Sequence, residues 1–437
     1  MSKTLEKDFL YIYENLRTNH FEDYFARLNK ALFLYFKEIW YQSSTKLHIS
    51  FFNHYDKKTK EENRLQTQYF LDKLVKLLHS LDNDSCNSAV KNEIKSLTTS
   101  FINSNEFLNL NISKDYPNDL IIATKDFINN SIKYDERFNF NDIFQALRNA
   151  WTMNLLQATF NIDIEMTEPV FGYSMLYPYT DNLLDTSHLS LEEKHLFSSR
   201  LKRRLVGELV LPLSPYEEQV FKLVTFIEDT YSRKDYYVLY KSLQYIHLLQ
   251  TQSLRQQTNQ SSLDLDKVIE ISFSKGGLSV LTDAYLIRGE LNLPEIIFSF
   301  GLGIALQLLD DLQDIKADEK EGNITIFTHS MDKQYLDDNV TRLVNFISYL
   351  VDLIPNENKH YIQNIKQALK RNCILMVLFA ASRNSKLFRK EFVENIQQFY
   401  PYPVSYMKKF NSILNSKCTK IRKLKNLKVT DILDLLL

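Results

Sequence analysis

Glycine is scarce in this chain of 437 residues. Only eight glycines occur, all between Gly172 and Gly322, and there are nine prolines. A β-rich protein of this length would need glycine throughout the chain for its hairpin turns. Apolar residues recur instead every three or four positions, for example over residues 140–160, as amphipathic helices require. The scarcity of glycine and this period together predict an all-α protein.

Cysteine is rare and the net charge is close to zero. Cys86, Cys373 and Cys418 lie far apart without metal-ligand spacing, which favours a reduced, cytoplasmic setting. A formal net charge of −1 provides no basic field for nucleic acid. The longest apolar run, residues 373–381, is too short to cross a bilayer, and the first residues form no apolar signal core. We expect a soluble cytoplasmic protein whose only membrane contact is transient, for a lipophilic substrate or product.

Two polar segments divide the predicted helices into an early and a late group. Residues 81–105 are rich in serine and asparagine, and a second break surrounds Pro117. We place a domain boundary near residue 130. The expected parts are a helical N-terminal extension over residues 1–130, of no assignable role, and a bundle of roughly ten helices over residues 131–437.

An acidic row follows a strongly apolar stretch in residues 301–323, GLGIALQLLDDLQDIKADEKEGN. Asp310, Asp314 and Asp318 stand four residues apart, so on one continuous helix they would share a face and rise roughly 6 Å per step. Like charges at this spacing weaken a helix. A bound cation would offset that repulsion, whereas the alternative interpretation is an ordinary solvated acidic face.

A second acidic pair, Asp181 and Asp185 in DNLLD, repeats the spacing of four. Two helices could therefore present facing carboxylates to one cavity. Oxygen ligands without histidine or cysteine favour Mg²⁺, which usually shares its coordination shell with substrate phosphate. The predicted Mg²⁺ ligands are Asp181, Asp185, Asp310, Asp311, Asp314 and Asp318.

These motifs resemble those of the class I isoprenoid synthase superfamily. QLLDDLQD (307–314) is similar to the second aspartate-rich motif of polyprenyl diphosphate synthases, and the acidic row followed by Gly322 also fits squalene and phytoene synthases. DNLLD resembles the DxxxD motif of the latter and the DNLxD box of bacterial large-terpene synthases. The resemblance covers residues 140–330 by motif. It implies an all-α bundle around a central cavity, Mg²⁺ and a prenyl diphosphate substrate, with Asp181, Asp185, Asp310 and Asp314 as catalytic residues.

The chain also departs from these families. It has no DDxxD first motif, which argues against head-to-tail chain elongation, and no DxDD box for proton-initiated cyclisation. Gln313 stands where squalene and phytoene synthases usually carry arginine. These departures favour a terpene synthase that cyclises the cation. A prenyltransferase of the head-to-head or chain-elongating type, a phosphohydrolase and an inactive helical scaffold stay open as alternatives.

A diphosphate also needs cationic side chains, and arginine forks suit phosphate oxygens best. The predicted diphosphate ligands are Arg200, Arg204, Lys275, Lys316 and Lys320. Lys275 precedes Gly276 and Gly277, a pair that costs roughly 2 kcal/mol inside a helix relative to alanines. Such a pair indicates either a helix break that aims Lys275 into the cavity, as in the resembled families, or close packing of two helices.

Overall fold

The computed structural model describes residues 24–49, 53–84, 87–104, 115–135, 140–185, 190–256, 264–331, 334–355 and 360–421, with isolated positions before and after these ranges. These residues form helices and no strands, so the all-α prediction is confirmed. The helices are α2 (Tyr24–Gln42), α3 (Lys57–Asn83), α4 (Ser88–Ser104), α5 (Asp115–Tyr134), α6 (Phe140–Thr159), α7 (Glu168–Asp185), α8 (Leu191–Val206), α9 (Pro215–Thr230), α10 (Tyr237–Gln256), α11 (Leu265–Arg288), α12 (Leu293–Gln313), α13 (Ile315–Glu321), α14 (Ile326–Met331), α15 (Asp337–Asp352), α16 (His360–Arg383), α17 (Lys390–Gln397) and α18 (Val404–Ile421).

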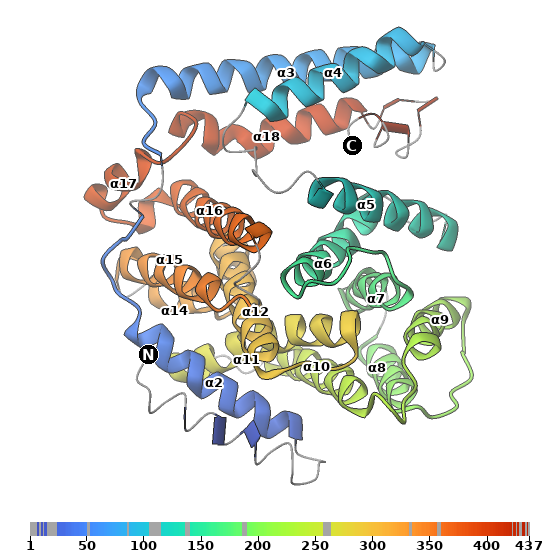
Figure 1. Ribbon diagram of the computed structural model, residues 1–437. Helices are drawn as coiled ribbons and strands as arrows, with labels where there is room; N and C mark the ends of the chain where they lie inside the picture. Colours follow the sequence, from blue (N-terminus) through green and yellow to red (C-terminus); the bar gives the residue numbers. More distant parts are fainter. Residues whose placement is uncertain are drawn as a thin grey trace.

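Helices α11 and α12 form an antiparallel hairpin at the centre of the molecule (Figure 1). Gly289 ends α11 with a φ of 83°, which favours glycine because an L side chain there meets the backbone. Asn292 begins α12 with a capping box, in which Asn292 and Glu295 each accept a backbone N–H of the other. Helices α6, α7 and α10 pack on α11, while α14, α15 and α16 pack on α12.

The two central helices approach one another closely because glycines face each other at their crossing. A Cβ atom on Gly303 would lie only 2.0 Å from the carbonyl oxygen of Gly276, and one on Gly277 would lie 2.6 Å from the Phe300 ring. Helix α11 runs without interruption from Leu265 to Arg288. Close packing, and not a helix break, is therefore the reason for the Gly276–Gly277 pair.

The predicted boundary near residue 130 falls inside α5. Helix α2 belongs to the main core, where Phe36 stacks on Phe300 with ring centroids 5.9 Å apart. Helix α3 instead packs with α4 and with α18, which comes from the far end of the sequence (Figure 1). Leu74, Leu78 and Ile94 form a separate small core there with Leu435. The described helices of this region are thus distributed over two cores, with α2 and α5 in the main core and α3 and α4 in the small one.

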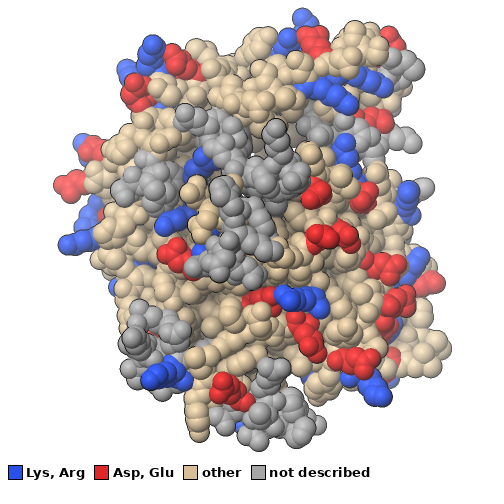
Figure 2. Space-filling model, viewed as in Figure 1, with Lys and Arg blue, Asp and Glu red and all other residues tan. Residues whose placement is uncertain are grey.

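Helix α12 is long and apolar enough to cross a membrane by length and composition, and 67% of that segment is buried inside the protein. A central helix of a bundle needs the same composition, because it is surrounded by other helices. On the face shown in Figure 2, acidic and basic side chains are spread among one another over the described surface.

Candidate functional site

A cavity of about 640 Å³ lies against the central hairpin, with walls from α6, α7, α8, α10, α11, α12 and α16. This volume is in the usual range for small-molecule sites. Apolar and aromatic side chains form much of its wall, including Trp151, Tyr177, Phe197, Ile246 and Leu306. Carboxylates and cationic groups occupy other parts of the same wall.

Two of the predicted metal ligands, Asp310 and Asp314, line this cavity. The expectation of one continuous helix through the acidic row is wrong, because α12 ends at Gln313 and α13 begins at Ile315. Asp314 stands between them with φ −100° and ψ 9°. Its N–H still donates to the Asp310 carbonyl at 3.0 Å, and the Asp318 N–H donates to the Asp314 carbonyl at 2.9 Å. Backbone hydrogen bonds between residues four apart therefore continue across the break between α12 and α13.

The acidic side chains of this row repel one another. Burial raises the pKa of Asp314, and the charge of Asp310 raises it further. Burial also raises the pKa of Asp318, against a hydrogen bond from Asn323, and the charges of Asp314, Asp310 and Glu321 add to that increase. A cation bound among these carboxylates would relieve the repulsion.

Asp311, the second carboxylate of the Asp310–Asp311 pair, is buried between α11 and α12, at 6% exposure. Its Oδ1 accepts a hydrogen bond from Gln307 Nε2 at 2.7 Å and its Oδ2 accepts one from Ser272 Oγ at 3.1 Å. Burial raises the pKa of Asp311 to about 7, although the hydrogen bonds and the charge of Lys275 lower it in part. Asp311 is not part of the cavity wall. This geometry gives it a packing role and does not support its predicted role as a metal ligand.

Three cationic side chains lie near the cavity carboxylates. Lys275 belongs to the wall. Arg148 of α6 also lines the cavity and approaches Asp310, with an Nη2–Oδ1 distance of 3.5 Å. The charge of Arg383, at the end of α16, lowers the pKa of Asp314. The sequence analysis missed both arginines, although Arg148 is the one basic residue in the helical stretch 140–160.

The structure places the remaining predicted cations elsewhere. Lys316 and Lys320 are exposed on α13 and do not line the cavity. Arg200 lies outside the wall as well, and its guanidinium pairs with buried Glu217 at 2.7 Å. Arg204 forms an ion pair with Glu228. Contact of these four side chains with a diphosphate stays a prediction, and the two arginines are already engaged in holding α8 to α9.

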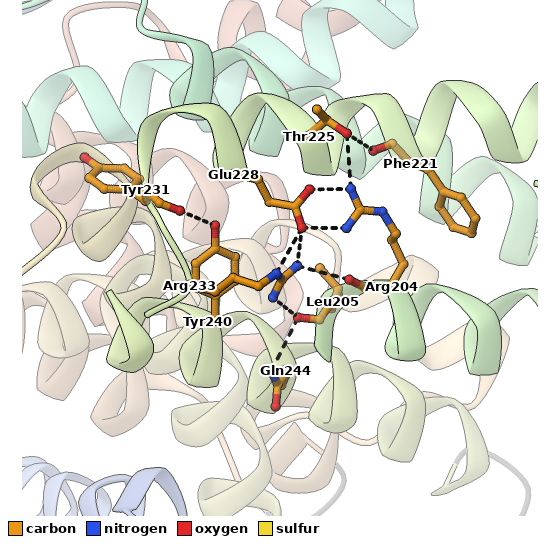
Figure 3. Close-up of polar contacts among 9 residues, drawn as sticks. All are labelled: Arg204, Leu205, Phe221, Thr225, Glu228, Tyr231, Arg233, Tyr240 and Gln244. Carbon is orange, nitrogen blue, oxygen red and sulfur yellow. Dashed lines mark hydrogen bonds and ion pairs between the residues drawn. The ribbon is translucent and has the colours of Figure 1, made fainter. Parts of the chain in front are cut away.

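The Arg204–Glu228 pair is part of a network that joins α8, α9 and the following loop (Figure 3). Arg204 also donates to Thr225 Oγ1 at 3.1 Å, and Arg233 donates to Glu228 Oε1 at 2.6 Å. Arg233 donates to the Leu205 carbonyl and lies 4.1 Å from the centre of the Tyr240 ring. Burial alone would raise the pKa of Glu228, but the hydrogen bonds from the two arginines outweigh it and lower the pKa. Glu228 is therefore the anion that balances two arginines.

Glu228→Gln should lower the free energy of unfolding by about 2 kcal/mol, because two half-buried arginines lose their counter-ion. Because the pKa of Glu228 is lower in the folded state, its charge stabilises the protein at pH values above 4.5, the pKa in the unfolded chain. This stabilisation is lost as the pH falls through the folded-state pKa. The difference between the wild type and Glu228→Gln should therefore shrink in acid. Urea unfolding at several pH values measures both effects. Glu218→Gln, exposed on the same helix, is the matched control, and an equal loss in both variants would contradict the assignment.

The donor set fits a hard cation only in part. Among the side chains that the structure describes, no group of three or more acidic, histidine or cysteine residues lies close enough to hold a metal ion. The side chains of Asp181 and Asp185, at the end of α7, lie outside the described residues. Mg²⁺ needs only one or two protein carboxylates when substrate phosphate and water complete its shell. Asp310 and Asp314 supply that minimum at the cavity wall.

No protein-family model, curated protein or solved structure matches this chain.

Proposed function

We propose that this protein is a Mg²⁺-dependent class I terpene synthase of the isoprenoid synthase superfamily. It would ionise an allylic prenyl diphosphate and guide the carbocation to a cyclic or rearranged product. The observation that carries the proposal is a single cavity of about 640 Å³ whose wall combines Asp310 and Asp314 with an extended apolar and aromatic surface. A prenyl diphosphate has the same two parts, a charged head and a hydrocarbon chain.

The acidic part of the wall supports binding of the head group. Mg²⁺, when bound, would neutralise diphosphate oxygens and stabilise the leaving group. Asp310 and Asp314 would hold the ion. Because the two carboxylates repel one another in the free protein, a bound cation would lower the electrostatic free energy of the pair. Arg148 pairs with Asp310, Lys275 lines the same cavity and Arg383 acts on Asp314 by its charge, so these three cations would bind the remaining phosphate oxygens.

The apolar part of the wall supports the chemistry that follows. The carbon–oxygen bond of the allylic diphosphate breaks, and its electron pair leaves with pyrophosphate. The allylic cation then reacts with a double bond of its own chain, and a proton lost from a neighbouring carbon ends the reaction. Trp151, Tyr177 and Phe197 line the cavity, and aromatic rings stabilise cations that lie over their faces.

A ladder of prenyl diphosphates tests this function. The purified protein is incubated with Mg²⁺ and chains from geranyl upward, singly and in pairs, and pyrophosphate release and the mass of the extracted products are measured. A product of the substrate's carbon number establishes cyclisation, whereas a product of summed carbon number establishes a prenyltransferase. Release of linear alcohol alone identifies a phosphohydrolase.

Thermal unfolding separates the enzyme from an inactive scaffold. Pyrophosphate with Mg²⁺ at a hundredfold excess over its Kd should stabilise the folded state by about 2.7 kcal/mol. Pyrophosphate with EDTA is the control. The absence of stabilisation together with the absence of turnover on the whole ladder would overturn the proposed function in favour of the scaffold.

A further inference from the structure

Asp283 of α11 is a carboxyl group in the cavity wall, and among the described residues no charged side chain contributes to its shifted pKa. It is 1% exposed and lies in an apolar stretch of the sequence, LSVLTDAYLI. Its Oδ1 accepts a hydrogen bond from Asn149 Nδ2 of α6 at 3.2 Å. Its Oδ2 is buried and has no hydrogen-bond partner among the described residues. A buried polar atom without a partner is costly, and folded proteins rarely keep one without a reason.

Asp283 is set apart from the carboxylates of the acidic row. Lys275, Ser279 and Asp283 follow one another at intervals of four on α11, and all three line the cavity. At 1.5 Å per residue, Asp283 is about 12 Å from Lys275 along the helix axis. Ser279 between them is engaged in a hydrogen bond with the Tyr177 hydroxyl, 2.7 Å away. Lys275 is near the acidic row, because its charge lowers the pKa of Asp311. Asp283 is therefore remote from the place where a cation would bind.

The carboxyl group of Asp283 is neutral near pH 7. Burial raises its pKa to about 8, and the hydrogen bond from Asn149 offsets only part of this effect. A neutral carboxylic acid has one O–H donor and one carbonyl acceptor. Since Oδ1 already accepts from Asn149, the proton belongs on Oδ2, where it is a donor without an acceptor.

We propose that Asp283 and Asn149 form a hydrogen-bonding subsite for a neutral oxygen, a hydroxyl or carbonyl, of the molecule that occupies the cavity. A pure hydrocarbon would leave the Asp283 donor unpaired, whereas an oxygen atom at this depth accepts its hydrogen bond. If the proposed function is taken as the basis, the inference also specifies the substrate: its prenyl chain carries an oxygen atom. The subsite itself can be tested without any diphosphate.

Cyclohexanol and methylcyclohexane, which have similar size and differ in the hydroxyl group, are the probes. Infrared difference spectra of the wild type against Asp283→Asn identify the carbonyl stretch of the protonated Asp283. Cyclohexanol should shift this band and raise the unfolding temperature more than methylcyclohexane does. The preference for the alcohol should be about tenfold in Kd, the value of one hydrogen bond to a buried group. Asp283→Leu should abolish it, and Asp283→Asn, which keeps a donor, should retain part of it.

The empty protein provides a second measurement. Asp283→Leu should unfold at a higher temperature than the wild type, because it removes an unpaired carboxyl group and fills the same space. A lower unfolding temperature for Asp283→Leu would mean that Asp283 stabilises the fold, and this would overturn the proposal. Equal responses to the two probes, or an alcohol preference that survives in Asp283→Leu, would also overturn it. None of these results depends on pyrophosphate release, so failure of the subsite and failure of the proposed function remain distinguishable.

Discussion

Asp314→Ala should abolish Mg²⁺-dependent release of pyrophosphate, with kcat/KM reduced by about a thousandfold or more. The expected size follows from the several kcal/mol by which a metal ion stabilises a leaving group, since each 1.36 kcal/mol is a factor of ten in rate. Asp314 lines the cavity at the break between α12 and α13, where the charge of Asp310 repels its carboxylate. Higher Mg²⁺ should recover part of the activity of Asp314→Asn, which keeps one oxygen ligand.

The same change should not destabilise the fold. Removing one of two repelling carboxylates leaves the apolar face of α12 intact, so the unfolding temperature should stay within a degree or rise. Glu319→Ala, which removes an exposed carboxylate from α13 outside the cavity wall, is the matched control and should keep full activity. Activity of Asp314→Ala within a few-fold of the wild type, or an equal loss in Glu319→Ala, would exclude the acidic row as the metal site.

Gly303→Ala should lower the free energy of unfolding by about 3 kcal/mol or more. The new methyl group would lie 2.0 Å from the Gly276 carbonyl oxygen, a backbone atom that cannot move unless α11 moves. The higher helix propensity of alanine recovers only about 1 kcal/mol. Urea unfolding measures the difference. Because Gly276 and Gly303 both line the cavity, separation of the helices should also weaken ligand binding.

Gly301→Ala, two residues earlier on the same helix, is the control for this prediction. Its added methyl group would meet the ends of the Leu350 and Phe36 side chains, at 2.5 and 2.7 Å, and side chains can shift where a backbone cannot. We therefore expect a smaller loss for Gly301→Ala. If both variants unfolded at the same urea concentration, the backbone contact between α11 and α12 would not be the limiting one.

The helical class and the interest of the acidic row and of Lys275, which the structure places at a cavity, follow from local signals in the sequence. Apolar spacing predicts helices because each helix carries its own buried face. The Gly276–Gly277 pair also predicts a structural irregularity, but a single sequence does not distinguish a helix break from close packing of two helices. That decision depends on Gly303, a residue of another helix.

The partners of the ion pairs could not be predicted for the same reason, because they belong to other helices. Arg200 and Arg204 have the residue type and spacing of a phosphate site, yet each pairs with a glutamate of α9. Arg383 is far from Asp314 in sequence and approaches it only once α16 packs on α12. Asp283, by contrast, carried a visible signal, because a lone carboxylate in an apolar helical stretch has to be paired, neutral or functional.

The packing of α18 on α3 has a consequence for the order in which the parts of the protein fold. Asp72 of α3 pairs with Lys417, and Asp82 accepts a hydrogen bond from the Asn426 N–H at 2.6 Å. On the ribosome, α3 emerges hundreds of residues before α18, so the part of its apolar face that α18 covers stays exposed through most of translation. The main core also depends on distant partners, since α2 packs on α11, α12 and α15, but those helices emerge before α18, so the small core closes last. Chaperone binding and proteolysis of nascent chains should therefore concentrate on α3 and α4.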